Sequence, residues 1–160
     1  MRPLPLPPGL AEVFAYNPET GAITYKVDHN GHVAGSAAGR LNNFGYVLLP
    51  FKGKSYVAHR VAWLLHTGED AHLLVDHING TKTDNRFSNL RLADKSQNGC
   101  NRRGTSQWGK GVSKSGCKFK ASIKIDGRTI YLGRFPEVVQ ARDAFRAAAI
   151  KYHGEFARFE

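Results

Sequence analysis

The chain has 160 residues, of which 41% are hydrophobic and 22% charged, and this composition favours a folded protein over a disordered one. No stretch approaches the roughly 18 consecutive apolar residues of a membrane-spanning helix. The net charge of +10 is uneven, since residues 1–99 hold 10 Lys/Arg against 8 Asp/Glu and residues 100–160 hold 13 against 5. The basic last third favours a polyanionic partner, but charge alone does not separate DNA from RNA, an anionic membrane or a solvated surface.

The first segment of the chain is expected to be rich in short strands. MRPLPLPPGL is too short and too rich in proline for a secretory signal, so we expect an extended lead-in there. Residues 10–57 alternate apolar runs with turn signals, with a turn and a strand in YNPETGAITYKV and two strands joined at 52–54 in GYVLLPFKGKSYVAH. Residues 58–67 change to helical spacing, and Gly68 should end that helix. Residues 10–57 are expected to form a β-rich platform that packs on the core and adds DNA contacts.

The second segment, residues 73–103, predicts the order strand, loop, strand, helix. LLVDHI and NLRLA are the two short strands, and Asn79-Gly80 is a strong turn signal between them. Asp94, with Gln97 three residues later, is typical of the residue that caps the start of a helix.

The third segment, about 108–160, predicts three strands and a helix. The strands are GKGVSKSG, CKFKASIKID and RTIYLGRF, with Asp126-Gly127 as the second turn. Pro136 should lie in the first helical turn and Gly154 after the last. The apolar face of this helix should comprise Val138, Ala141, Phe145, Ala148 and Tyr152. The expected class is α+β, with domains at 1–103 and 109–160 and a linker at 104–108.

Four polar residues in the second segment have the chemistry of phosphodiester hydrolysis. Asp76 and His77 end a predicted strand, Asn89 lies 12 residues beyond His77, and Asn98 lies 9 further, in the predicted helix. Histidine titrates near neutral pH and can activate water, and carboxylate and amide oxygens suit a hard divalent cation. Because side chains alternate along a regular strand, a bulge or a strand end must bring Asp76 and His77 to one site. Taken singly, each of these residues is more often structural.

The stretch DHING…DNRFSNLRLADKSQNGCNR resembles the HNH endonuclease family, with its ββα-metal core, over roughly residues 57–103. It is most similar to the phage and intron-encoded, or homing, branch. The resemblance implies that His77 is the general base and that Asn89 braces the loop that positions it. It also implies that Asp76 and Asn98 hold one divalent ion, Mg²⁺ or alternatively Mn²⁺. Asn98 stands where many relatives carry the final histidine of the motif.

Further residues of this stretch match the branch. Asn85 is expected to brace the loop, and Arg60 to contact phosphate. His59, His66 and His72 are expected to be surface or packing residues rather than ligands.

Only two cysteines occur, Cys100 and Cys117, and neither lies in a CxxC pair, so we expect no structural zinc site. The low cysteine content also predicts a reducing, cytoplasmic setting, which would be that of the host cell if the protein is phage-encoded.

The third segment is expected to present lysines on one face of its sheet. Lys118, Lys120 and Lys124 alternate with apolar residues, which should lie under the helix. From Gly109 to the end, KGV, YLGRF, AR.AF..AA and HGEFA resemble the AP2 DNA-binding domain. Serine and glycine replace the arginines and tryptophan of strong base readers, which favours phosphate contacts. The expected DNA-binding residues are Arg60, Arg102, Arg103, Lys110, Ser113, Lys118, Lys120, Lys124, Arg128 and Tyr131.

The sequence therefore predicts a metal-dependent DNA endonuclease. The expected partner is double-stranded DNA, with no membrane and no small-molecule substrate, and the protein is a monomer or a homodimer. A non-catalytic DNA-binding or regulatory protein is the alternative. An RNA-directed protein is less favoured, because few aromatic residues are predicted on exposed strand faces.

Overall fold

The structure, a computed structural model, describes residues 5–159 and is α+β, as predicted. The chain divides into two compact units between Ala93 and Asp94. The sequence analysis placed its linker at 104–108 instead; the short helix α3 (Lys95–Cys100) groups with the second unit because it contacts the turn η2 (Gly154–Phe156). Residues 1–4 of the predicted lead-in lie outside the described residues. Within 5–159, no helix is long and apolar enough to cross a membrane.

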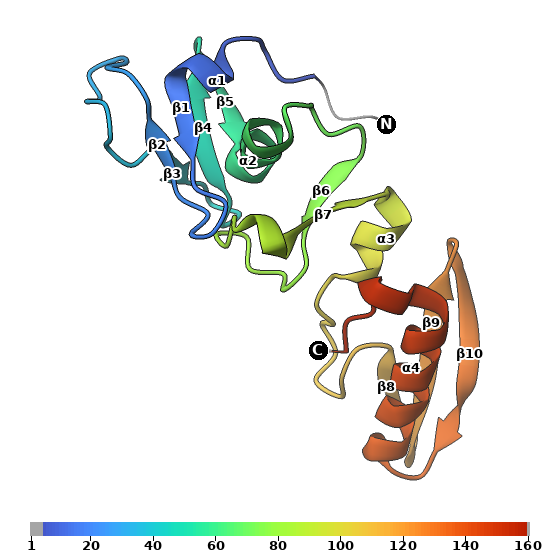
Figure 1. Cartoon of the computed structure of the whole chain (residues 1–160). Helices are drawn as coiled ribbons and strands as arrows, with labels where there is room; N and C mark the ends of the chain where they lie inside the picture. The colour runs from blue at the N-terminus through green and yellow to red at the C-terminus, as the bar shows by residue number, and fades with distance from the viewer. Residues whose placement is uncertain (1–4, 160) are drawn as a thin grey trace. The chain divides into compact units, whose positions relative to one another are not determined.

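The first unit combines three small antiparallel sheets with the helix α2 (Ala58–Thr67). The sheets are β1–β2, β3–β4–β5 and β6–β7, and α2 packs against β1, β4, β5 and β6 (Figure 1). The other elements are α1 (Leu10–Val13), β1 (Phe14–Tyr16), β2 (Ile23–Tyr25), β3 (Arg40–Leu41), β4 (Val47–Phe51), β5 (Lys54–Val57), β6 (Leu74–His77), η1 (Phe87–Asn89) and β7 (Leu90–Ala93).

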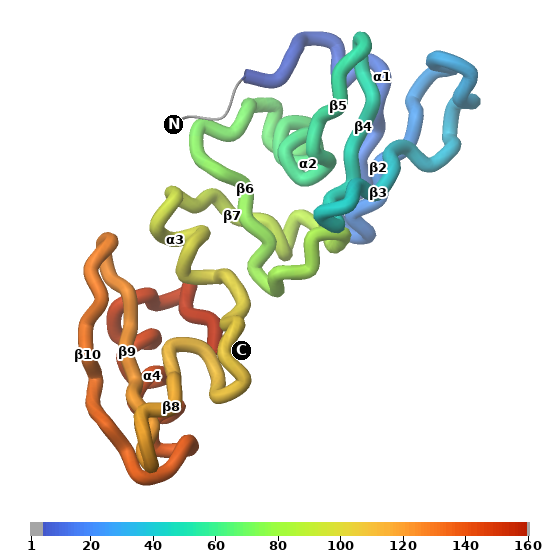
Figure 2. The backbone as a smooth tube through the Cα atoms, turned by 180° about the vertical axis from the view of Figure 1, so that it is seen from behind, coloured from blue at the N-terminus to red at the C-terminus, as the bar shows by residue number. Residues whose placement is uncertain are grey.

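Local sequence explains the boundaries that were predicted in this unit. β4 and β5 join at Lys52-Gly53, whose φ angles of 47° and 72° are those of a tight hairpin turn. Gly68, with φ of 78°, ends α2 in the left-handed conformation. The core lies between α2 and the strands, and the connection between β2 and β3 extends away from it (Figure 2). Its most buried large side chains are Leu10, Phe14, Tyr25, Leu49 and Val61.

The second unit is a three-stranded antiparallel sheet with one face covered by α4 (Val138–His153). The strands are β8 (Val112–Ser115), β9 (Lys118–Ile125) and β10 (Arg128–Phe135). Ala121 and Ile123 of β9 pack against Phe145 of α4. Gly111, with φ of 70°, allows this packing, because a Cβ there would lie 2.2 Å from the Phe145 ring.

Two details of the predicted last helix were wrong. Tyr152 is 47% exposed, and Ala149 is buried on the apolar face that Tyr152 was expected to join. Pro136 precedes the capping residue Glu137 and so lies outside the first helical turn.

Candidate active site

The pairing of β6 with β7 places Asp76 and His77 at the end of a strand. The antiparallel register is regular, with Asp76 opposite Arg91 and His77 opposite Leu90. Beyond His77 the chain turns, and the Gly80 amide donates to the His77 carbonyl at 2.9 Å. Of the two predicted alternatives, a bulge or a strand end, the structure has the strand end, because His77 is the last residue of β6.

The imidazole of His77 is buried and held on two sides. Its Nε2 lies 3.1 Å from Oδ1 of Asn85, which is also buried. With the amide oxygen of Asn85 as the acceptor, this contact favours the tautomer that carries the proton on Nε2 and the basic lone pair on Nδ1. The ring of His59 packs edge-on against His77, with centroids 4.9 Å apart, and Tyr46 packs against His59 at 5.4 Å. His59 is thus a packing residue, as expected.

Burial sets the protonation of both histidines. Desolvation lowers the pKa of His77, against the opposing effects of Asn85, Asp76 and Asp84. The pKa of His59 falls to about 3, again mainly because of burial. Both imidazoles are therefore neutral at neutral pH, and a neutral imidazole is the form that accepts a proton.

Asn89 ties together the loop that follows His77. Its Oδ1 accepts from the Asn79 amide at 2.9 Å, and its Nδ2 donates to the Asp84 carbonyl at 2.8 Å and to Asn79 Oδ1 at 3.0 Å. The Asp84 carboxylate accepts from Arg86 at 2.7 and 2.8 Å, which lowers the Asp84 pKa to about 2. These bonds fix both ends of the loop that carries Asn85.

The segment that forms this arrangement has relatives among known proteins. Residues 56–100 match the HNH endonuclease family. The chain is also 35% identical, over 119 residues, to a protein of Acanthamoeba polyphaga mimivirus named as an uncharacterized HNH endonuclease. That alignment covers 73% of this chain and 63% of the viral protein. No solved structure gives a significant match.

Asp76, which precedes His77 on β6, is the carboxylate that the sequence predicted as a metal ligand. Asp76 is buried and forms an ion pair with Arg91, whose Nη2 lies 3.1 Å from Oδ2. Among the described residues, no cluster of three or more His, Cys, Asp or Glu side chains could hold a metal by itself. HNH nucleases generally use a divalent ion, and Mg²⁺ needs only one or two carboxylates, with water and phosphate as its other ligands. The hard oxygens of Asp76 fit such an ion.

Asn98 lies on α3, in the second unit, and is half-buried. The predicted capping box that starts this helix is present, because Asp94 Oδ1 accepts from the Gln97 amide and Gln97 Oε1 accepts from the Asp94 amide, both at 2.8 Å. The role of Asn98 as a metal ligand stays a prediction.

The sequence analysis missed how the β1–β2 hairpin supports the loop between β6 and η1, residues 78–86. Tyr16 donates its hydroxyl to the Asn85 carbonyl at 2.7 Å, and the Phe87 amide donates to the Pro18 carbonyl at 2.9 Å. A Cβ on Gly21 would lie 2.5 Å from the Arg86 amide nitrogen. Burial and the charge of Asp84 raise the Tyr16 pKa to about 12, so its hydroxyl stays a donor. The turn signal at Asn17–Thr20 was visible, but its partner was not.

The residues predicted to bind DNA fall into several environments. Lys118, Lys120, Lys124 and Tyr131 are exposed on the sheet face opposite α4, and Ser113 pairs with Lys120 on that face. Arg128 pairs with Ile125, so it belongs to the other face, at the exposed end of the hairpin.

The other four predicted contacts lie off the strands of this sheet. Lys110 precedes β8 and is half-buried, with its ammonium donating to the Cys100 carbonyl. Arg102 and Arg103 follow α3 and are exposed. In the first unit, Arg60 forms an ion pair with Asp70 at 2.8 Å, and its side chain is 14% exposed, so its predicted phosphate contact would require this pair to open or share its partner.

Proposed function

We propose that this protein is a metal-dependent DNA endonuclease that hydrolyses phosphodiester bonds, with His77 as the general base. The observation that carries the proposal is the hydrogen bond from His77 Nε2 to Asn85 Oδ1, within a segment that matches the HNH endonuclease family. This bond selects the tautomer whose Nδ1 can take a proton from the attacking water. The regular strand and the Asn89 hydrogen bonds support the orientation of the ring.

The chemistry divides among residues of this chain. His77 Nδ1 accepts the proton of a water molecule that attacks the phosphorus as the P–O3′ bond breaks. The leaving 3′ oxygen takes a proton from solvent, and the imidazolium returns one to solvent. Asp76, together with the predicted ligand Asn98, would hold the divalent ion. When bound, such an ion offsets the negative charge that develops on the phosphate and on the leaving oxygen. The expected products carry 5′-phosphate and 3′-hydroxyl ends.

The second unit is the proposed DNA-holding module, of AP2-like type. Its outer sheet face carries a cross-strand row of Ser113, Lys120 and Arg134, and Lys120 Nζ lies 5.7 Å from the Tyr131 ring. A face of lysines and hydroxyls suits phosphate oxygens more than base edges. This arrangement supports duplex binding of low sequence selectivity by the module itself.

Incubation of supercoiled plasmid with the full chain tests the proposal. We expect nicking or linearisation with Mg²⁺ or Mn²⁺ and none with excess EDTA. An Asn98→Ala variant should need more metal than the wild-type protein to reach the same rate. If the plasmid stays intact with either ion over a wide range of DNA sequences, a non-catalytic DNA-binding protein becomes the better account.

A further inference from the structure

A cavity in the second unit lies along the part of β9 that extends beyond β8. The pairing of β8 with β9 ends at Val112 and Ala121, so residues 122–125 of β9 have no strand on that side. Gly111 and α3 approach this edge, and the Ser122 amide donates to the Gly111 carbonyl at 2.9 Å. The resulting cavity measures about 760 Å³. A cavity of this size holds a small organic ligand rather than a single water molecule or ion.

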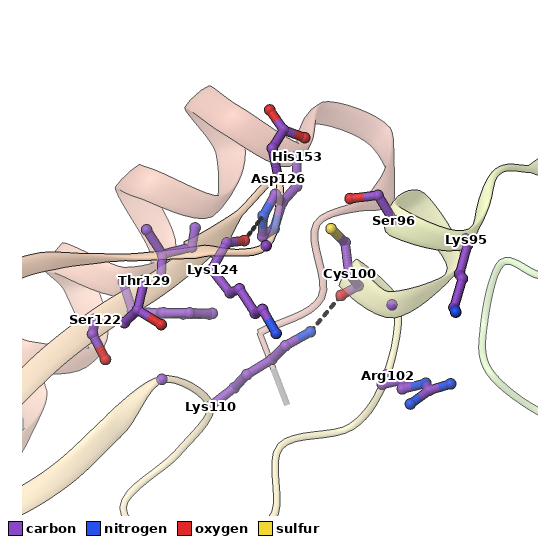
Figure 3. Close-up of a pocket in the computed structure, with 15 residues that line it drawn as sticks. Lys95, Ser96, Cys100, Arg102, Lys110, Ser122, Lys124, Asp126, Thr129 and His153 are labelled. Carbon is purple, nitrogen blue, oxygen red and sulfur yellow. Dashed lines mark hydrogen bonds between the residues drawn. The ribbon is translucent and has the colours of Figure 1, made fainter.

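The charge of the lining is strongly positive. Lys110 and Lys124 are directed from the sheet toward α3, and Lys95 and Arg102 lie on the α3 side (Figure 3). Asp126 is the single carboxylate among the described residues that line it. Lys110 and Lys124 are the cations directed into this space, whereas the side chains of Lys95 and Arg102 extend away from them (Figure 3). Two ammonium groups directed into one cavity attract an anion, and one carboxylate cannot neutralise the charge of the lining.

The environment of Lys110 favours an anionic ligand. Burial lowers the pKa of its half-buried ammonium, which means that the charged form has lost part of its hydration. Its hydrogen bond to the Cys100 carbonyl goes to a neutral acceptor, which does not offset the charge. An anion near Lys110 and Lys124 would restore the stabilisation that the Lys110 ammonium has lost.

The apolar part of the lining narrows the ligand class. Ile123 and Phe145 contribute to the cavity, and the hydroxyls of Ser122 and Thr129 are available as donors. An apolar surface beside a cationic rim suits a phosphate that carries a sugar better than an isolated inorganic ion. On α3, the lining residues 95, 96, 99 and 100 share one face, and helical spacing puts Asn98 on another. Binding here and the predicted role of Asn98 therefore do not compete.

We propose that this cavity binds a backbone phosphate and its sugar from the DNA strand, as a phosphate site separate from the rest of the outer sheet face. The identity of the strand rests on the proposed function, whereas the phosphate site itself does not. Such a site would fix one point of the duplex relative to α3.

The two cysteines allow a direct test on the full chain. Cys100 lines the cavity and Cys117, at the exposed β8–β9 turn, does not. We expect both a DNA duplex in EDTA and inorganic pyrophosphate to slow maleimide labelling of Cys100 several-fold, and pyrophosphate to leave Cys117 unchanged. Mass spectrometry of the digested protein reports each rate separately.

Charge-matched variants connect the protection to the cavity. Lys110→Met should abolish the protection by pyrophosphate and reduce the salt slope of DNA binding by about one. Lys151→Met removes the same charge from the exposed part of α4, outside the cavity, and should change neither. Lys124→Met, an exposed position, provides a second cavity variant if Lys110→Met is unstable.

The outcomes separate this site from the nuclease function. If the wild-type protein cleaves DNA but neither pyrophosphate nor DNA protects Cys100, the cavity proposal is wrong and the function stands. If both ligands protect Cys100 but no DNA is cleaved, the site stands and the enzymatic function fails. Protection by pyrophosphate without protection by DNA would overturn the assignment to a DNA strand.

Discussion

At the scale of single residues, the neighbours of His77 have separable effects. Asn85 bonds to the ring and fixes its tautomer, whereas His59 packs against it and is buried. Replacement of Asn85 should therefore affect catalysis first, and replacement of His59 should change how stability depends on pH.

Asn85→Ala should lower kcat by about tenfold or more with a smaller change in KM, because both tautomers of His77 become accessible. The buried Nε2 proton would also lose its acceptor, so unfolding should become easier by about 1–3 kcal/mol. Cleavage kinetics and urea unfolding measure the two effects. Asn43→Ala, at an exposed loop position, should change neither; an Asn85→Ala enzyme with wild-type kcat would contradict the role of Asn85.

His59 should make the first unit less stable in acid. Its pKa is about 3 in the folded protein and near 6.5 in the unfolded chain, so the unfolded state binds more protons between these values. The stabilisation is complete above pH 6.5 and is lost as the pH falls toward 3, with a slope of up to about 1.4 kcal/mol per pH unit. Unfolding of wild type and His59→Phe between pH 4 and 7 tests this. Equal slopes in the two proteins would show that His59 is not buried in its neutral form.

At the scale of elements, the β1–β2 hairpin and the turn that joins its strands contact the chain around residues 85–87, which follows His77. Gly21 and Gly53 both adopt left-handed φ, of 76° and 72°, but only at Gly21 would a Cβ meet backbone, whereas Gly53 has open space around it. Alanine at either position costs the strain of a positive φ, and at Gly21 it also displaces residues 85–86.

Gly21→Ala should therefore reduce both stability and cleavage rate, whereas Gly53→Ala should reduce stability alone, by about 1 kcal/mol. Thermal unfolding measures the stability of the two variants, and plasmid cleavage measures their activity. Gly53→Ala reports the effect of backbone strain alone, and Gly21→Ala reports strain together with displacement of residues 85–86. If Gly21→Ala cleaves at the rate of Gly53→Ala, the hairpin does not position the loop.

Local patterns predicted the regular elements of this protein and some of its boundaries. The helix at 58–67 and the capping box at Asp94 depend on neighbouring residues, and both were found. The join predicted at 52–54 is also present, one residue shorter, because Lys54 pairs with Phe51 as part of β5. The three-residue β1 and the two-residue β3 are strands only through pairing with β2 and β4, so their own sequence carries no pattern.

The sequence named the residues of the candidate site, but it could not give their contacts. The bond from His77 to Asn85 depends on an irregular loop whose path is fixed by Asn89 and by the distant hairpin. The pairing of Arg60 with Asp70, and of Asp76 with Arg91, likewise depends on side chains that meet only in the folded chain.

At the scale of the whole molecule, most of the excess charge and most of the proposed catalytic residues occupy different parts of the chain. Asp76, His77 and Asn89 lie in the first unit, and most of the excess positive charge lies in residues 100–160. If the basic part neutralises about six phosphates, DNA affinity should fall on the order of a thousandfold between about 50 and 200 mM salt. Fluorescence anisotropy in EDTA measures this slope. A slope near zero would contradict binding through phosphates.

The most direct test of the account is the single-turnover cleavage rate of His77→Ala compared with that of His72→Ala, in Mg²⁺ on the same plasmid. His72 is an exposed histidine outside the site and serves as the matched control. We predict a loss of about 10²- to 10⁴-fold for His77→Ala and a wild-type rate for His72→Ala. Equal rates for the two variants, with both proteins folded, would show that the buried imidazole at the end of β6 does not activate the attacking water.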